Sequence, residues 1–133
     1  MATIFEMIIN GEIPSTRLYE DDQCVVILDI NPTKKGHALV ISRKPYRNFT
    51  EVPFETLCHM MKIAQLVDKK QREVLGAEGT NIIINNDPAS GQEVPHLHIH
   101  VIPRYTGDGR TMKGEKDKYE DGEIAVYGEK LRI

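Results

Sequence analysis

The sequence predicts an α+β fold, in which a mostly antiparallel sheet of five strands is flanked by one long helix and preceded by a short N-terminal helix. Short runs rich in Val, Ile and Leu recur along the chain between turn-forming residues, which is typical of strands. After Pro53 the apolar residues instead recur at three- and four-residue steps, which is typical of an amphipathic helix. These two observations predict the fold class.

The first expected element is the short N-terminal helix. Thr3 and Glu6 have the spacing of a capping box, with Thr3 as the N-cap and Glu6 at the third helical position. The helix should run from Ile4 through Ile9 and stop near Gly11.

Three strands are expected next. Residues 17–20 and 24–30 are predicted strands joined by a turn at 21–22. A loop at 31–36 then leads into a third strand at 37–41.

The long helix should begin after Pro53 and end at Gly76, a residue suited to a helix C-cap. Its apolar stripe is formed by Phe54, Leu57, Met61, Ala64 and Val67. A short buried strand at 82–84, a loop at 85–95 and a final strand at 96–102 complete the predicted elements.

The end of the chain differs in composition from the rest. Residues 1–104 are expected to form one domain, and residues 105–133 a charged C-terminal tail. The last 30 residues hold 7 Lys or Arg and 7 Asp or Glu, so they cannot bury much of themselves. We expect this tail to pack on the domain or on a dimer partner.

The composition disfavours several classes of protein. The net charge is -3 and there is no dense basic cluster, which disfavours DNA or RNA binding. No apolar run approaches the ~20 residues that span a bilayer, and no signal peptide is apparent. Cys24 and Cys58 have neither a metal-ligand nor a disulfide-framework spacing. We therefore expect a cytoplasmic protein that binds neither nucleic acid nor a membrane.

Three histidines alternate with aliphatic residues in the last predicted strand. Because successive side chains of a strand point to opposite faces, His96, His98 and His100 are expected to share one face. Imidazole can serve as nucleophile, acid, base or metal ligand near neutral pH. This run is therefore the candidate active site.

Two other interpretations of these histidines stay open. A half-buried strand can carry incidental polar residues on its outer face, and His-x-His spacing can place two imidazoles on one metal ion. However, the chain has no further Cys/His cluster, and the preceding loop at 85–92 offers amide donors and the flexible Gly91. We expect this loop to cradle phosphate oxygens, with no metal and no cofactor.

The segment 91–102, in which Gln92, Val94 and the three histidines keep a fixed spacing, resembles the signature of the histidine triad (HIT) superfamily of nucleotide hydrolases and transferases. Further blocks that resemble this superfamily, in the same order, lie at 4–14, 29–32 and 36–41. The small nucleoside phosphoramidase branch is the most similar, and the ending at 102–104 is shared with diadenosine-polyphosphate hydrolases. The resemblance implies a HIT-like fold.

The resemblance also implies a reaction. The protein would be a hydrolase or nucleotidyl transferase acting on the α-phosphate of purine nucleotides, either a nucleoside 5′-phosphoramidate or a dinucleoside polyphosphate. His98 would attack the α-phosphorus and form a covalent nucleotidyl-histidine, which water then cleaves. Two alternatives are a nucleotide-binding or scaffold protein with little activity and a histidine-based metal-binding protein.

The same resemblance assigns roles to other polar residues. His100, Gln92 and Asn85 would donate to phosphate oxygens. His37 and His96 would orient the other imidazoles and tune their protonation.

The nucleoside would be held by the earlier blocks of the resemblance. Asp29 would accept hydrogen bonds from the ribose hydroxyls. Apolar contact with the base would come from Ile4, Phe5, Ile8, Ile27 and Ile30, although plain core packing also explains these side chains. A homodimer is implied as well.

Two positions depart from the pattern of the phosphoramidase branch. Many of its members carry two cysteines that help to bind structural zinc, where this chain has Thr3 and Glu6. Many relatives also have Ser or Thr on the leaving-group side, where this chain has Glu93.

Overall fold

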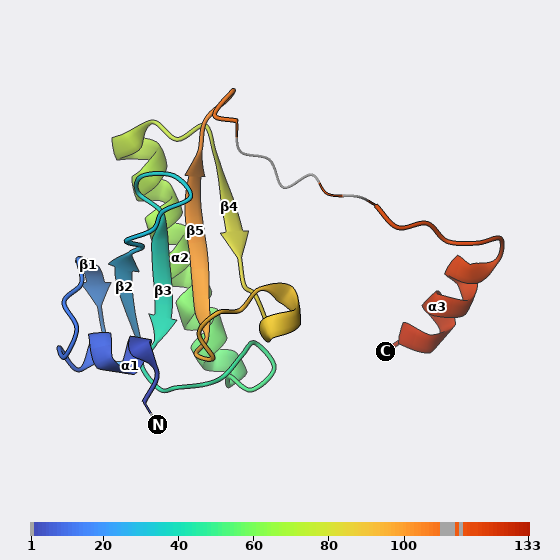
Figure 1. Ribbon diagram of the computed structural model, residues 1–133, viewed down its shortest axis with the longest axis horizontal. Coiled ribbons are helices and arrows are strands. Elements are labelled where there is room, and N and C mark those ends of the chain that lie inside the picture. The colour runs from blue at the N-terminus through green and yellow to red at the C-terminus, as the bar shows by residue number, and fades with distance from the viewer. Residues whose placement is uncertain (1, 110–113, 115) are drawn as a thin grey trace.

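The computed structural model describes residues 2–109, 114 and 116–133 (Figure 1). Five strands form one antiparallel sheet in the spatial order β1-β2-β3-β5-β4. The strands are β1 (Arg17–Glu20), β2 (Cys24–Leu28), β3 (Ala38–Ser42), β4 (Gly79–Ile83) and β5 (His98–Arg104). With one long helix and a short N-terminal helix, the α+β fold that the sequence predicts is confirmed.

The long helix α2 (Phe54–Leu75) lies along one face of the sheet (Figure 1). Gly76 ends it in the left-handed conformation, with φ at 67°, as the sequence predicts. The larger core lies between this helix and the sheet, and its buried members are Cys24, Val26, Ala38, Val40, Val52, Leu57, Met60, Ile63, Ala64, Leu97, Ile99 and Val101. The buried stripe of α2 therefore differs in part from the predicted one, because Phe54 and Met61 are exposed.

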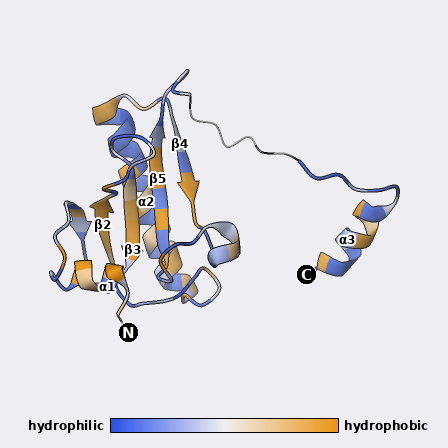
Figure 2. Ribbon diagram, viewed as in Figure 1, coloured by the Kyte–Doolittle hydropathy of each residue, from blue (hydrophilic) through white to orange (hydrophobic). Residues whose placement is uncertain are grey.

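The opposite face of the sheet is covered in part by the short helix α1 (Ile4–Ile9). Both hydrogen bonds of the predicted capping box are present: Thr3 Oγ1 accepts from the Glu6 N–H at 3.1 Å, and Glu6 Oε1 accepts from the Thr3 N–H at 2.9 Å. A second core cluster joins this helix to the strands through Phe5, Ile8, Val25, Ile27, Leu39 and Ile41. Because both of their faces are buried, β2 and β3 are hydrophobic along their length (Figure 2).

The last strand begins two residues later than the sequence predicts. Its prediction at 96–102 is wrong for His96 and Leu97, because the chain turns just before β5 and the His96 N–H donates to the Val94 carbonyl oxygen at 2.8 Å. Pro95 has no N–H to offer a neighbouring strand. The alternation within β5 itself holds, since Ile99 and Val101 lie in the core under α2 and His98 and His100 point to the other face.

The tail contains a helix, α3 (Glu123–Leu131), which is not among the elements predicted from the sequence. None of its nine residues is buried. That residues 105–133 pack on the domain or on a dimer partner stays a prediction. Within the part of the chain that the structure describes, no helix combines the length and the apolar character needed to cross a membrane.

Candidate active site

A cleft of about 640 Å³ opens beside α1, on the sheet face that α2 does not cover. Its walls come from α1, the end of β2 with the loop that follows, the segment before β5, and β5 itself. The predicted site residues that line it are Ile4, Phe5, Ile8, Ile27, Asp29, Ile30, His37, Asn85, Glu93, His98 and His100. His96 and Gln92 lie outside this lining.

The His98 imidazole is held in one orientation by the backbone of His96. Its Nδ1 lies 2.7 Å from the carbonyl oxygen of His96. A carbonyl oxygen only accepts, so Nδ1 carries the proton and Nε2 keeps its lone pair when the ring is neutral. Burial lowers the pKa of His98, which keeps the ring neutral at neutral pH. The Phe5 ring packs against it in a T-shaped arrangement, with ring centroids 4.8 Å apart. The arrangement leaves a lone pair of the kind that a nucleophile needs.

A chain of hydrogen bonds fixes the proton of His100. The Thr33 N–H donates to His37 Nδ1 at 3.1 Å, so neutral His37 carries its proton on Nε2. That nitrogen lies 2.9 Å from His100 Nδ1, which must accept, and the His100 proton is therefore on Nε2. Burial, together with His98 and His37, lowers the pKa of His100 to about 4. His100 thus presents an N–H donor beside the His98 ring, with ring centroids 4.9 Å apart.

His96 is fully buried and does not reach the cleft. Its Nε2 donates to the Ser42 carbonyl oxygen at 2.6 Å, which leaves Nδ1 as an acceptor. The Thr3 hydroxyl donates to that Nδ1 at 2.7 Å while it accepts the Glu6 N–H. His96 therefore joins α1 to the end of β3 and acts on His98 through its backbone carbonyl.

Thr3→Val removes the hydroxyl and keeps the volume of the side chain. We expect the free energy of unfolding to fall by about 1–2 kcal/mol, because a helix N-cap is lost and His96 Nδ1 loses its donor. Urea denaturation measures this, with Thr3→Ser as the control that restores the hydroxyl. A Thr3→Val protein as stable as the wild type would show that the hydroxyl contributes nothing.

The Gln92 side chain makes two hydrogen bonds to backbone groups, and its donation to phosphate stays a prediction. Its Oε1 accepts from the Asp87 N–H at 2.6 Å, and its Nε2 donates to the Arg47 carbonyl oxygen at 2.7 Å. Asp87 has φ at 70° and ψ at 161°, a backbone region that is costly for a residue other than glycine. The amide of Gln92 therefore holds the loop in a strained conformation, and Gln92 is not among the residues that line the cleft.

Asp29 and the apolar side chains that were predicted to hold a nucleoside line the same cleft as His98 and His100. One Asp29 oxygen, Oδ1, accepts from the Asn31 N–H at 2.9 Å, and the other, Oδ2, lies 3.7 Å from His37 Nε2. Phe5, Ile8 and Ile27 are buried side chains of the second core cluster, so core packing accounts for part of their position. Ile4 and Ile30 are 48% and 87% exposed, which leaves both available to a ligand.

Comparison with known proteins agrees with this geometry. The family model of the HIT domain matches residues 10–107. The chain belongs to the HIT family. An uncharacterized HIT-like protein of Methanocaldococcus jannaschii is 50% identical over 113 residues, which cover 83% of this chain and 84% of that protein. The adenosine 5′-monophosphoramidase hnt1 of Schizosaccharomyces pombe is 36% identical over 104 residues, which cover 78% of this chain and 75% of that protein.

A solved HIT structure, described as a zinc-bound histidine triad family protein from Mycobacterium smegmatis, has a TM-score of 0.80 and 39% identity over 88% of this chain and 85% of that one. At the two positions where many members of the phosphoramidase branch carry zinc-binding cysteines, this chain has side chains that are not available to a zinc ion. Thr3 and Glu6 are engaged in the cap of α1, and both ring nitrogens of His96 already have protein partners.

The three triad histidines also fail to converge on one ion. In the described part of the chain, the group of possible metal ligands in the cleft contains Asp29, His37 and His100, without His96 or His98. His37 and His100 in that group already share a hydrogen bond. The described residues therefore do not form a metal site from the three triad histidines, and the phosphate cradle stays a prediction.

Two contributors to the HIT site were missed in the sequence. Thr33 sets the tautomer of His37 through its backbone N–H, and any residue except proline can supply that group. Thr3 was identified as a helix cap, but its contact with His96 spans 93 positions. Neither contact has a signal in the local sequence.

Proposed function

We propose that this HIT protein hydrolyses a purine nucleotide at its α-phosphate through a covalent nucleotidyl-histidine at His98. One observation carries the proposal: the Nδ1–H of His98 is committed to the His96 carbonyl, so its Nε2 lone pair is the reactive position. The Nε2–H of His100 lies beside it as a donor to a phosphate oxygen.

The proposed reaction has two displacements. In the first, the His98 Nε2 lone pair forms a bond to the α-phosphorus, the bond to the leaving group breaks, and the leaving group takes up a proton. The imidazole becomes positively charged, and its Nδ1–H bond to the His96 carbonyl stabilises that charge. In the second, water attacks phosphorus and gives up one proton, which replaces the proton that the leaving group took up. The N–P bond breaks, and neutral His98 and a nucleoside monophosphate result. Splitting one displacement into two lowers each barrier.

The His37–His100 pair supplies the electrostatic part of the catalysis. Because both rings are neutral, the pair offers a donor fixed in place before reaction, and no proton has to be rearranged. Asn85 lines the same part of the cleft and adds a neutral amide donor. Asp29 accepts from the ribose hydroxyls, and the apolar wall beside α1 contacts the base.

A substrate panel tests the proposal. Because the Schizosaccharomyces pombe relative is named an adenosine 5′-monophosphoramidase, adenosine 5′-phosphoramidate is the first compound to test. Diadenosine polyphosphates and nucleotidyl sugars follow. We expect release of AMP, and protein quenched in alkaline denaturant, which preserves the N–P bond, that carries one nucleotidyl group on His98 by mass spectrometry. Tight binding of nucleotide without turnover of any compound, or turnover without a protein-bound nucleotide, would contradict the covalent route.

Glu93 lines the cleft next to the triad, and we propose that it protonates an amine leaving group. Glu93→Gln is therefore expected to slow hydrolysis of a phosphoramidate far more than hydrolysis of an activated aryl ester. The reason is that an amine leaves with a proton, whereas an activated phenol leaves without one. The two values of kcat, measured on the same preparation, control for changes in folding. Equal losses on both substrates would rule out the acid role.

A further inference from the structure

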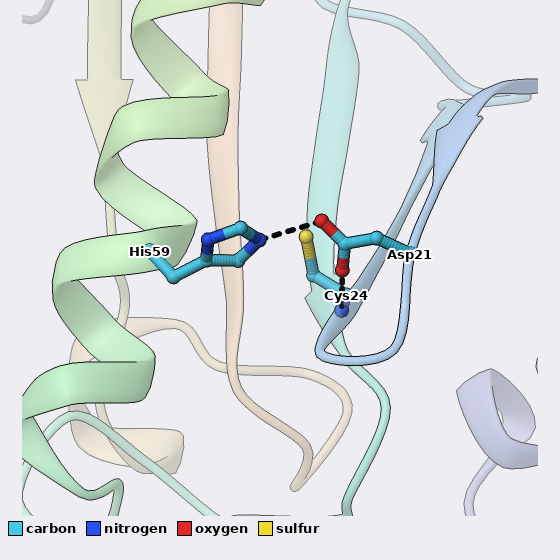
Figure 3. A group of neighbouring side chains, drawn as sticks. All are labelled: Asp21, Cys24 and His59. Carbon is cyan, nitrogen blue, oxygen red and sulfur yellow. Dashed lines mark hydrogen bonds and ion pairs between the residues drawn. The ribbon is translucent and has the colours of Figure 1, made fainter.

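A second cluster of chemically active side chains lies away from the nucleotide cleft, at the α2 side of the sheet (Figure 3). Asp21 is in the turn between β1 and β2, Cys24 is the first residue of β2, and His59 projects from α2. One carboxylate oxygen, the thiol sulfur and one imidazole nitrogen all lie within 4.8 Å of one another. Three different elements therefore bring an oxygen, a sulfur and a nitrogen ligand to one point.

The backbone of the β1–β2 turn holds the Asp21 carboxylate in place. Its Oδ1 accepts from the N–H groups of Gln23 and Cys24, at 2.8 and 2.9 Å. Its Oδ2 lies 2.5 Å from His59 Nε2 and accepts from the Tyr19 hydroxyl at 2.7 Å. Partial burial raises the pKa of Asp21, but the hydrogen bonds from Tyr19 and His59 outweigh it and hold that pKa well below its usual range. The site thus contains a fixed anion.

We propose that Asp21, Cys24 and His59 bind one Zn²⁺ ion, with water as the fourth ligand. Mixed Cys, His and carboxylate ligands in small number are typical of zinc, whereas Ca²⁺ and Mg²⁺ need six or more oxygen ligands. Side chains of Asp21 and His59 are 18% and 26% exposed, which leaves an open path for the ion and its water. Cys24 is fully buried behind them.

Binding at this site requires one proton to leave. Burial raises the pKa of the Cys24 thiol to about 12, so the thiol is protonated before the ion arrives. The ion takes the place of that proton: the S–H bond breaks, an S–Zn bond forms, and the proton goes to solvent. The bound thiolate and the Asp21 carboxylate together balance the charge of the ion.

The spacing of the ligands needs only a small adjustment. Zinc–ligand bonds of about 2.0–2.3 Å in a tetrahedron place ligand atoms roughly 3.3–3.8 Å apart. The Asp21–His59 contact of 2.5 Å must lengthen, and His59 is on a helix surface where its side chain can retract. An ion held this way would join α2 to the turn before β2, and would stabilise the fold without taking part in the nucleotide chemistry.

The test must separate this site from the other group of possible ligands, Asp29, His37 and His100 in the nucleotide cleft. Co²⁺ serves as the probe, because a thiolate bound to Co²⁺ gives a charge-transfer absorption in the near ultraviolet, and a site without sulfur gives none. Only the proposed site contains a cysteine. We expect this absorption to saturate at one Co²⁺ per chain and to disappear when Zn²⁺ is added.

Three variants decide where the ion binds. Cys24→Ser is expected to lose the absorption, and His59→Gln to weaken Zn²⁺ binding at least about tenfold. Cys58→Ser is the matched control, because Cys58 is an exposed thiol next to His59 in the chain, and it should behave as the wild type. His59 is partly exposed, so its variant remains informative if the loss of buried Cys24 disturbs folding.

Thermal unfolding gives an independent measurement. An ion that binds only the folded protein raises Tm, so Zn²⁺ should raise Tm of the wild type and of Cys58→Ser but not of His59→Gln. The proposal is overturned if the thiolate absorption is absent from the wild type, persists in Cys24→Ser or is lost in Cys58→Ser. It is also overturned if the Zn²⁺-dependent rise in Tm persists in His59→Gln but is lost in His100→Gln, which would place the ion in the nucleotide cleft.

Discussion

Replacing His98 with alanine is expected to abolish turnover while leaving the affinity for a nucleoside monophosphate within about tenfold, a difference of ~1.4 kcal/mol. In the proposed mechanism the nucleophile makes its bond only in the transition state, whereas the proposed contacts of the apolar wall and Asp29 with the nucleoside exist in the ground state as well. Steady-state kinetics and calorimetric titration with AMP measure the two quantities. More than a few per cent of the wild-type rate in this variant would refute the covalent assignment.

A second substitution at the same position separates chemistry from folding. His98→Asn keeps an amide N–H where the imidazole Nδ1–H donates to the His96 carbonyl, but it has no nucleophilic nitrogen. We therefore expect His98→Asn to be as stable as the wild type and as inactive as His98→Ala. An active His98→Asn enzyme would mean that the histidine acts through its position in the fold and not as the nucleophile.

The largest effect of pH is expected on stability. Burial lowers the pKa values of His37, His96 and His98, and lowers that of His100 to about 4. In the unfolded chain these groups titrate near 6.5. Between the folded-state pKa and the unfolded-state pKa of each histidine, the unfolded chain binds more protons than the folded one. The free energy of unfolding therefore rises with pH through this window and falls as the pH falls. Above about pH 6.5 the histidines are neutral in both the folded and the unfolded state, and their contribution to stability is fully present.

Each histidine that stays neutral in the folded state contributes a slope of about 1.4 kcal/mol per pH unit within its window. Urea denaturation at steps from about pH 7.5 to about pH 4.5 should therefore show a steep loss of stability below about pH 6.5. His100→Gln is expected to lower that slope by about 1.4 kcal/mol per pH unit, the contribution of one proton. The reason is that it removes the group whose pKa is displaced to about 4. An unchanged slope in this variant would mean that His100 is protonated in the folded protein.

Much of this fold is encoded by local patterns. The capping box at Thr3 and Glu6 places α1 correctly, and Gly76 ends α2 where the sequence indicates. The alternation of His98 and His100 with aliphatic residues correctly assigns the two faces of β5. Patterns of this kind predict structure well, because a helix end or the face of a strand depends on residues only a few positions away in the sequence.

The first member of the triad shows where local patterns fail. His96 continues the alternation perfectly, but it lies in a turn before β5 and points into the protein. Its position depends on Thr3 of α1 and on the carbonyl of Ser42 at the end of β3. An alternating sequence cannot show whether the neighbouring strand continues far enough to pair with it.

The sequence by itself determined the α+β class, the position of the long helix, the family and the segment that carries the three alternating histidines. Only the tertiary structure decided that Gln92 holds its loop, that His37 fixes the proton of His100, and that Cys24 meets Asp21 and His59. The His37–His100 bond spans 63 positions and the Asp21–His59 pair 38. The orientation of a polar side chain depends on hydrogen-bond partners that the folded chain brings from distant positions, and the local sequence does not contain them.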